Sequence, residues 1–274
     1  MQLSILDKMK ETAAFLQSQY AHRPEVGIVL GSGLGNFTKE IAIEKEVPYS
    51  EIPHFPVSTV EGHSGKLIFG ELSGKKVMAM AGRFHYYEGY SPQDVVFPVR
   101  VMHLLGVTTL LLSNAAGAVN ADFAVGDIML IKDHVSFFTP NPLIGRNIDS
   151  LGPRFPDMSE PYKKHLLDKA RQIGKEEGYD LKEGVYVGVT GPTFETRAEY
   201  QLIKVVGGDV VGMSTVQEAI AAVHMGMNVF AASVVTDLGI REEENVITHE
   251  EVLAAAKEAE PKLATLFRRL VASI

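Results

Sequence analysis

Short apolar runs, most of them followed by glycine or polar residues, constrain the fold of this chain more than any other feature. Several runs are apolar at nearly every position, as in Val107–Leu112, which favours a sheet that is covered on both faces. Helical patterns separate the runs, and strands that alternate with helices indicate the α/β class. The expected strands span 26–30, 66–69, 77–81, 108–112, 127–131, 185–189 and 229–236.

The first expected helix is N-terminal, because apolar residues from Ile5 to Tyr20 recur at helical spacing. Ser91 before Pro92 is a typical helix start, and Ser214 and Thr248 each begin a capping-box pattern. Since the chain has no repeat and no flexible linker, we expect a single domain over residues 1–274. The other expected helices span 92–105, 159–177, 196–206, 214–226 and 248–272.

Composition excludes several functional classes. The formal net charge of -8 argues against non-specific nucleic-acid binding, although a local cluster of donors can still hold a small anion. The absence of cysteine excludes disulfides, thiolate metal sites and a cysteine nucleophile. No apolar run approaches the ~20 residues of a membrane span. Because residues 1–8 lack the apolar centre of a signal peptide, we expect a cytoplasmic protein.

The glycine-rich segment 31–35, GSGLG, follows the first expected strand. Glycines let the backbone turn sharply and aim N–H groups at an anion, and Ser32 adds a hydroxyl donor. The pattern is not a dinucleotide fingerprint, because Asn36 stands where glycine is needed, and it lacks the lysine of a Walker loop. An anion loop and a structural turn both remain open here. His63, between glycines, is likewise either a ligand contact or an ordinary loop histidine.

The segment 82–90, GRFHYYEGY, indicates a binding site most clearly. If the chain stays extended after the strand, Arg83, His85 and Tyr87 alternate onto one side. A guanidinium, an imidazole and a phenol then converge, and the forked donors of arginine suit a phosphate or a carboxylate. A strand end with solvated polar side chains is the simpler alternative, but the flanking glycines favour a site.

Two further segments have side chains suited to a ligand. The small residues of segment 113–117, SNAAG, leave room for a ligand at the carboxyl end of a strand, or simply pack closely. Phe194 suits stacking on a flat ring, and Glu195 suits accepting ring N–H groups. Helix capping by the neighbouring threonines is compatible with both roles.

Four other places complete the candidates. Ser214 stands at a helix start, where an anion is favoured, and the pair Thr236-Asp237 ends the last long strand. His249 lies in the first turn of the last helix, where the helix dipole favours a neutral imidazole. The proline- and glycine-rich loop 138–156 is either functional or a surface excursion. Because no metal-ligand motif and no nucleophile elbow occurs, neither a metal nor a protein nucleophile is expected.

In this order, the segments resemble the trimeric purine nucleoside phosphorylases, and they run from residue 31 to residue 256. The resemblance implies a single α/β domain with a mixed central sheet and a small barrel, surrounded by helices, and a homotrimeric assembly. The matching pieces are GSGLG at 31–35, VEGHSGKLIFG at 60–70, GRFHYYEGYSP at 82–92, SNAAGAVN at 113–120, RFPDMSEPY at 154–162, GPTFETRAEY at 191–200, VGMSTVQE at 211–218 and HEEVLAAA at 249–256.

The activity that the resemblance implies is reversible phosphorolysis of inosine- or guanosine-type nucleosides to a free purine and (deoxy)ribose 1-phosphate. Phosphate is then a co-substrate, and no cofactor is needed. The implied catalytic residues are His85, Glu195 and Asp237. The implied phosphate contacts are Ser32, His63, Arg83, His85, Ala115 and Ser214. The implied nucleoside contacts are Tyr87, Phe155 (lent by a neighbouring subunit), Phe194, Glu195, Met213, Thr236, Asp237 and His249.

Asp237 departs from the family pattern, because members specific for 6-oxopurines usually have asparagine there. An amide accepts from a protonated N7 and donates to O6, whereas an ionised carboxylate only accepts. Asp237 therefore suits the 6-amino group of adenine, unless burial keeps it protonated. Glu195 favours 6-oxopurines instead, because it pairs with an N1–H that adenine lacks. We expect inosine and guanosine as main substrates, with a wider tolerance of 6-aminopurines.

Three other functions compete with this prediction. A methylthioadenosine phosphorylase of the same fold is favoured by Asp237 but disfavoured by Glu195 and His249. A nucleoside hydrolase would leave the arginine, histidine and serine set without a purpose. A non-catalytic purine- or phosphate-binding regulator is the alternative from a different class.

Overall fold

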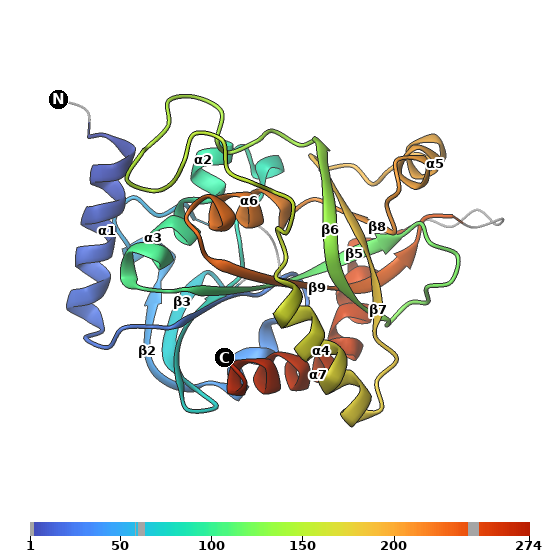
Figure 1. Ribbon diagram of the computed structural model, residues 1–274, viewed down its shortest axis with the longest axis horizontal. Helices are drawn as coiled ribbons and strands as arrows, with labels where there is room; N and C mark the ends of the chain where they lie inside the picture. The colour runs from blue at the N-terminus through green and yellow to red at the C-terminus, as the bar shows by residue number, and fades with distance from the viewer. Residues whose placement is uncertain (1–2, 58, 60–63, 241–246) are drawn as a thin grey trace.

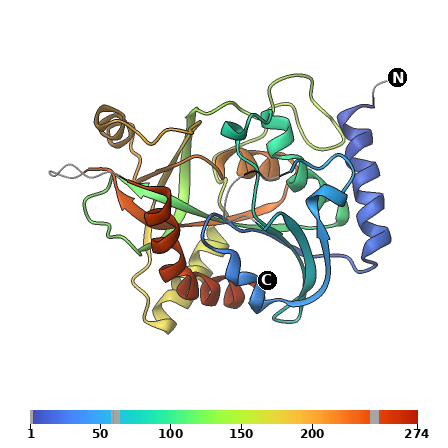
Figure 2. The same ribbon diagram turned by 180° about the vertical axis from the view of Figure 1, so that it is seen from behind.

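The computed structural model describes residues 3–57, 59, 64–240 and 247–274. Within these ranges, a mixed sheet with the strand order β2-β3-β4-β1-β5-β8-β7-β6-β9 forms the centre of the molecule (Figures 1 and 2). Its strands are β1 (Val26–Val29), β2 (Ala42–Pro48), β3 (Lys66–Leu72), β4 (Lys75–Ala81), β5 (Thr109–Ala118), β6 (Ile128–Phe138), β7 (Lys182–Val189), β8 (Val210–Gly212) and β9 (Asn228–Leu238).

One half of the sheet closes into a small barrel. Strand β5 pairs with β8 and also with β9, so the order β5-β8-β7-β6-β9 returns to its first strand. The other half, β2-β3-β4, is an antiparallel extension that reaches the barrel through β1. The predicted α/β domain with a mixed sheet and a small barrel is therefore confirmed.

Parallel pairing determines where a ligand can bind. Strand β1 is parallel to both β4 and β5, and β5 is parallel to β9. Since the carboxyl ends of parallel strands meet at one edge of a sheet, the segments that follow β1 and β4 converge with the last residues of β5 and β9. These segments contain half of the candidate residues that the sequence predicted.

Helices cover the sheet (Figure 1). Helix α1 packs on α3 and α3 on α6, while α4 packs on α7 and α7 on β9; α5 lies at the end of the molecule opposite α1. In the described part of the chain, no helix combines the length and the apolar character needed to cross a membrane. The helices are α1 (Ile5–Gln19), α2 (Pro92–Val95), α3 (Phe97–Leu105), α4 (Lys164–Glu177), α5 (Arg197–Val205), α6 (Val216–His224) and α7 (His249–Ala272), with short 3-10 turns at Gly35–Glu40, Tyr49–Glu51 and Tyr86–Glu88.

Some predicted boundaries were wrong. Strand β5 continues through the segment 113–117, because pairing with β9 holds these small residues in the barrel. Strand β2 was missed because most of its side chains are exposed, which removes the apolar signal, and β8 because it has only 3 residues. The helix predicted over 92–105 is divided at Val96, and the one predicted over 159–177 begins at Lys164.

Predicted helix caps had mixed outcomes. Ser91 and Thr248 are N-caps as expected, and Thr248 forms a capping box with Glu251. The capping box predicted from Ser214 is wrong, because Thr215 precedes α6 with a φ of 70° and makes no side-chain cap bond. A positive φ is strained for a β-branched residue, and such strain concentrates at functional sites.

Candidate active site

A pocket with a volume of about 370 Å³ lies where the strand ends converge. Phe155 does not line it, and His63 lies outside the described residues. The structure brings together all the other predicted site residues in this one pocket. They are Ser32, Arg83, His85, Tyr87, Ala115, Phe194, Glu195, Met213, Ser214, Thr236, Asp237 and His249.

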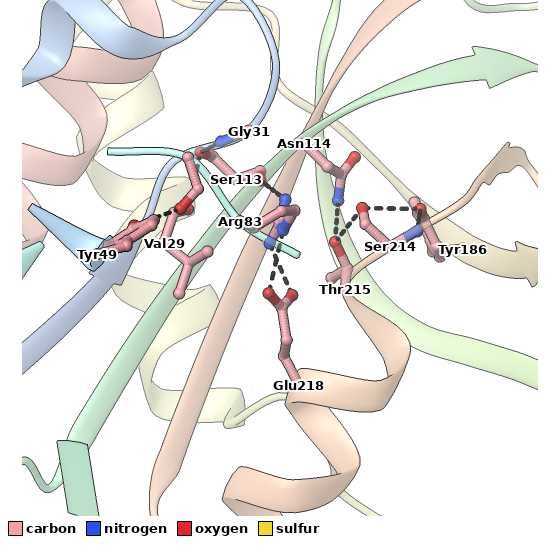
Figure 3. A network of polar contacts seen from close by, with 11 residues as sticks. Val29, Gly31, Tyr49, Arg83, Ser113, Asn114, Tyr186, Ser214, Thr215 and Glu218 are labelled. Carbon is pink, nitrogen blue, oxygen red and sulfur yellow. Dashed lines mark hydrogen bonds and ion pairs between the residues drawn. The ribbon is translucent and has the colours of Figure 1, made fainter. Parts of the chain in front are cut away.

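Arg83, which follows β4, is one of the largest fully buried side chains among the described residues, with an exposed fraction of 1%. Its Nε donates to Oε1 of Glu218 over 3.1 Å and its Nη2 to Oε2 over 2.7 Å, while Nη1 donates to the carbonyl of Ser113 (Figure 3). A carboxylate that accepts two parallel bonds holds the guanidinium plane in one orientation. The charge of Arg83 therefore reaches the pocket already compensated by Glu218.

Ser113 connects this ion pair to the central strands. Its hydroxyl donates to the carbonyl of Val29 over 3.1 Å and accepts from the backbone N–H of Gly31 over 3.2 Å. A Cβ added to Gly31 would lie 2.8 Å from the Cα of Asn114, so only glycine allows this close approach. Gly31 thus has a structural role, and the neighbouring Ser32 lines the pocket.

His85 and Tyr87 reach the pocket through a 3-10 turn at Tyr86–Glu88, so the extended path predicted for them is wrong. Their rings stack with centroids 4.6 Å apart. The Nδ1 of His85 lies 2.9 Å from the carboxylate of Glu88. Burial lowers the pKa of His85 below its ordinary value, against the opposing effect of the Glu88 bond.

The carboxylate of Glu88 orients the imidazole ring of His85. Burial disfavours its ionised form, but hydrogen bonds from His85 and Thr59 outweigh this effect and lower the pKa of Glu88 to about 2. An ionised carboxylate only accepts, so the proton of a neutral His85 resides on Nδ1. The Nε2 atom is then left as an acceptor.

Ser214 is held by a second chain of polar contacts (Figure 3). Asn114 donates to the hydroxyl of Thr215 over 2.9 Å, and this hydroxyl lies 3.1 Å from that of Ser214. The backbone N–H of Ser214 donates to the hydroxyl of Tyr186 over 3.3 Å. The strained Thr215 is thus stabilised by Asn114, and it fixes where Ser214 meets the pocket.

Two carboxylates also line the pocket, those of Glu195 and Asp237. Asp237 is buried, and the hydroxyl of Thr236 donates to its Oδ1 over 3.0 Å. Burial raises the pKa of Glu195, and the nearby charge of Asp237 raises it further. Phe194 is exposed by 42%, which leaves its ring accessible to a flat ligand.

Phe155 lies apart from this pocket. Its side chain is 88% exposed, and it borders a second cavity together with Phe137 and Ile144, which are also highly exposed. The guanidinium of Arg154 lies over its ring, 5.6 Å from the centroid. Exposed aromatic side chains around a cavity are typical of surfaces that contact another chain.

The sequence alone did not assign a role to several residues that shape the pocket. Glu218 is a buried acid on the first turn of an otherwise apolar helix, and Glu88 follows His85 at a spacing of three. Buried acids among apolar residues are rarely unpaired, and this rule is the sequence signal that could have identified them. Among the described residues, no group of three or more His, Cys, Asp or Glu side chains is arranged to hold a metal ion.

Comparisons with known proteins agree on one family. The family model described as "Phosphorylase superfamily" matches residues 25–272. The chain is 48% identical to purine nucleoside phosphorylase 1 of Geobacillus stearothermophilus. The 266 aligned residues cover 97% of this chain and 96% of that protein.

Solved structures are also similar to this chain. Purine nucleoside phosphorylase of Schistosoma mansoni, in complex with adenosine, superposes with a TM-score of 0.94 at 40% identity over 99% of both chains. A schistosoma purine nucleoside phosphorylase in complex with hypoxanthine gives the same TM-score of 0.94 and 40% identity, over 100% of this chain and 99% of that one.

Proposed function

The chain belongs to the phosphorylase superfamily, and we propose that it is a purine nucleoside phosphorylase that cleaves inosine- and guanosine-type nucleosides reversibly. The observation that supports this proposal most strongly is a single pocket that is lined both by an arginine, histidine and serine set and by an aromatic and carboxylate set. The first set suits phosphate, and the second suits a purine. Full-length similarity to proteins named purine nucleoside phosphorylase supports the same activity.

Phosphate is the nucleophile of this reaction, so the protein must place it rather than supply a nucleophile of its own. A phosphate oxygen forms a bond to the anomeric carbon of the ribose, and the bond from this carbon to the purine nitrogen breaks. In the transition state, the sugar has oxocarbenium character. Ser32, Arg83 and Ser214 donate to the phosphate. The Nε2 of neutral His85 accepts a hydrogen bond from the phosphate hydroxyl, which orients the unprotonated phosphate oxygens for attack.

The base end stabilises the departing purine. Electron density moves onto the imidazole ring of the base as the bond to the sugar breaks, and N7 takes a proton from solvent, which neutralises the departing base. Asp237 then accepts from the N7–H, and Glu195 accepts from N1–H of a 6-oxopurine. Phe194 stacks on the base, while Tyr87, Met213 and His249 surround the ribose.

Base preference depends on the two carboxylates. Glu195 favours inosine and guanosine, whereas an ionised Asp237 faces O6 of these bases unfavourably and suits a 6-amino group. We assign the main activity to 6-oxopurine nucleosides, with adenosine as a slower substrate. A relative bound to adenosine and another bound to hypoxanthine support tolerance of both substituents in this fold.

The assembly that we propose is a homotrimer in which Phe155 enters the pocket of a neighbouring subunit. Phe155 is 88% exposed and Phe137 is 90% exposed, and burying such rings stabilises an interface. Light scattering of the purified protein is expected to give three times the chain mass of 29.9 kDa, and Phe155→Ala is expected to raise KM for inosine. If the purified protein is a monomer and Phe155→Ala leaves the kinetics unchanged, the proposed assembly is wrong.

One assay tests the proposed activity. Base release from inosine, adenosine and methylthioadenosine is followed with and without inorganic phosphate. Inosine cleavage that requires phosphate and yields ribose 1-phosphate is expected. Cleavage without phosphate indicates a hydrolase, preference for methylthioadenosine indicates the related phosphorylase, and no cleavage indicates a binding protein; each of these results contradicts the proposal.

A further inference from the structure

Tyr200 has a buried hydroxyl that the proposed reaction leaves unused. The side chain is 5% exposed, and its hydroxyl oxygen has no hydrogen-bond partner of good geometry among the described residues, although Glu195 lies near enough to interact with it. Buried hydroxyls are bonded in the great majority of cases, so an unsatisfied one requires an explanation. The hydroxyl lies near Glu195 and Asp237, two of the residues that line the pocket.

The start of α5 brings Tyr200 next to Glu195. Thr196 is the N-cap, and it forms a capping box with Glu199. Glu195 is therefore the residue before the cap and Tyr200 the fourth helical residue. Side chains at these two positions pack against each other at helix starts, usually as an apolar pair. Here the same geometry pairs a carboxylate with a phenol.

The end of β9 holds the ring from the other side. A Cβ added to Gly239 would lie 2.4 Å from ring carbons of Tyr200. The backbone N–H of Gly239 donates to the carbonyl of Ala118 over 2.8 Å, which fixes this approach. The phenol is thus confined between α5 and the strand that carries Asp237.

Both carboxylates of the base end act on this hydroxyl. Burial raises the pKa of Tyr200, and the charges of Glu195 and Asp237 raise it further. In return, the Tyr200 hydroxyl lowers the pKa of Glu195, against the effects of burial and of Asp237. Glu199, the other acid of this turn, is engaged by Thr196. The hydroxyl of Tyr200 is therefore a donor located beside two acceptors of like charge.

We propose that Tyr200 is a positioning residue for base specificity, whose hydroxyl donates to the Glu195 carboxylate from behind when a purine occupies the pocket. This inference rests on the proposed function. The bond keeps Glu195 ionised and directed at the base, so that it accepts from the N1–H of a 6-oxopurine. Without the bond, Glu195 beside Asp237 takes up a proton more readily and becomes a donor, which suits the unprotonated N1 of adenine.

Tyr200→Phe tests this role, because it removes the hydroxyl and keeps the ring between Gly239 and α5. The ratio of kcat/KM for inosine to that for adenosine is expected to fall about tenfold, as for the loss of one hydrogen bond to a charged group. KM for phosphate is expected to stay unchanged. An unchanged substrate ratio, or an equal loss for both nucleosides, overturns the proposal.

Two controls separate specificity from folding. Tyr20→Phe removes another buried phenol that bonds a carboxylate, that of Glu44, far from the pocket, and it is expected to leave the ratio unchanged. In a Glu195→Gln background, Tyr200→Phe is expected to have little further effect on the ratio, because the two residues act as a unit; an undiminished effect overturns the proposal. If the wild type lacks phosphate-dependent inosine cleavage, the proposed function fails first.

Discussion

In the function that we propose, the pocket has one end for phosphate and one for the base, and the residues of the two ends are held differently. At the phosphate end, Arg83 is locked between Glu218 and the Ser113 carbonyl, and His85 is held by Glu88, so every charged group here has a bonded counterpart. At the base end, Glu195 and Asp237 are two carboxylates within electrostatic reach of each other. Like charges in a half-buried site make protonation sensitive to small changes.

This difference indicates where function can vary. A compensated, hydrogen-bonded network is costly to disturb, because removing one member leaves another buried and unpaired. A pair of acids can instead change its proton count with little structural change. We therefore propose that the phosphate end determines the reaction type and that the base end determines which purine is accepted.

Arg83→Ala gives the largest expected effect and tests whether the phosphate end is interlocked. It leaves Glu218 buried without its partner, which is expected to lower the free energy of unfolding by about 3 kcal/mol or more. Loss of a preorganised donor is expected to lower kcat/KM for phosphate by about 100-fold or more. Urea denaturation and steady-state kinetics measure the two effects.

Arg171→Ala is the matched control. Arg171 also binds a glutamate through two nitrogens, Nε and Nη2, but its side chain is 41% exposed. Exposed pairs contribute little, so the loss is expected to stay below about 1 kcal/mol with unchanged kinetics. Equal losses of stability in the two variants contradict an interlocked phosphate end.

Glu88→Gln gives a smaller effect that depends on pH. Because the pKa of Glu88 is lowered from 4.5 to about 2 in the folded protein, its ionised form adds stability above about pH 4.5, and this contribution is lost as pH falls toward 2. The urea midpoint of the variant is expected to lie below that of the wild type near neutral pH, and the gap is expected to narrow in acid.

The exposed acid Glu46, which pairs with Lys66, provides the comparison. Glu46→Gln is expected to shift the midpoint less at neutral pH. If the gap between the wild type and Glu88→Gln is the same in acid as at neutral pH, Glu88 does not hold His85 through its charge.

The sequence predicted which residues share one pocket better than it predicted the elements that carry them. Glycine and polar residues after apolar runs located the loops at 31–35 and 82–90, because strand ends in an α/β sheet meet at one edge. The edge strand β2 escaped detection because its side chains face solvent. The extended conformation predicted for His85 to Tyr87 was wrong, although both residues line the pocket.

Residues that act through a partner could not be placed from sequence. Glu218 is distant from Arg83 in the chain, and only the packing of α6 under the strand ends brings them together. Tyr200 and Ile203 form the buried face of α5, and the Tyr200 hydroxyl gains significance only from Glu195 and Gly239 beside it. Such pairs depend on tertiary contacts that periodicity does not encode.

The measurement that tests the contrast between the two ends most directly is the effect of Asp237→Asn on substrate choice and on phosphate binding together. An amide at this position donates to O6, so the ratio of kcat/KM for inosine to that for adenosine is expected to rise about tenfold, while KM for phosphate stays unchanged. An unchanged ratio, or a phosphate KM that shifts as much as the ratio, contradicts the account.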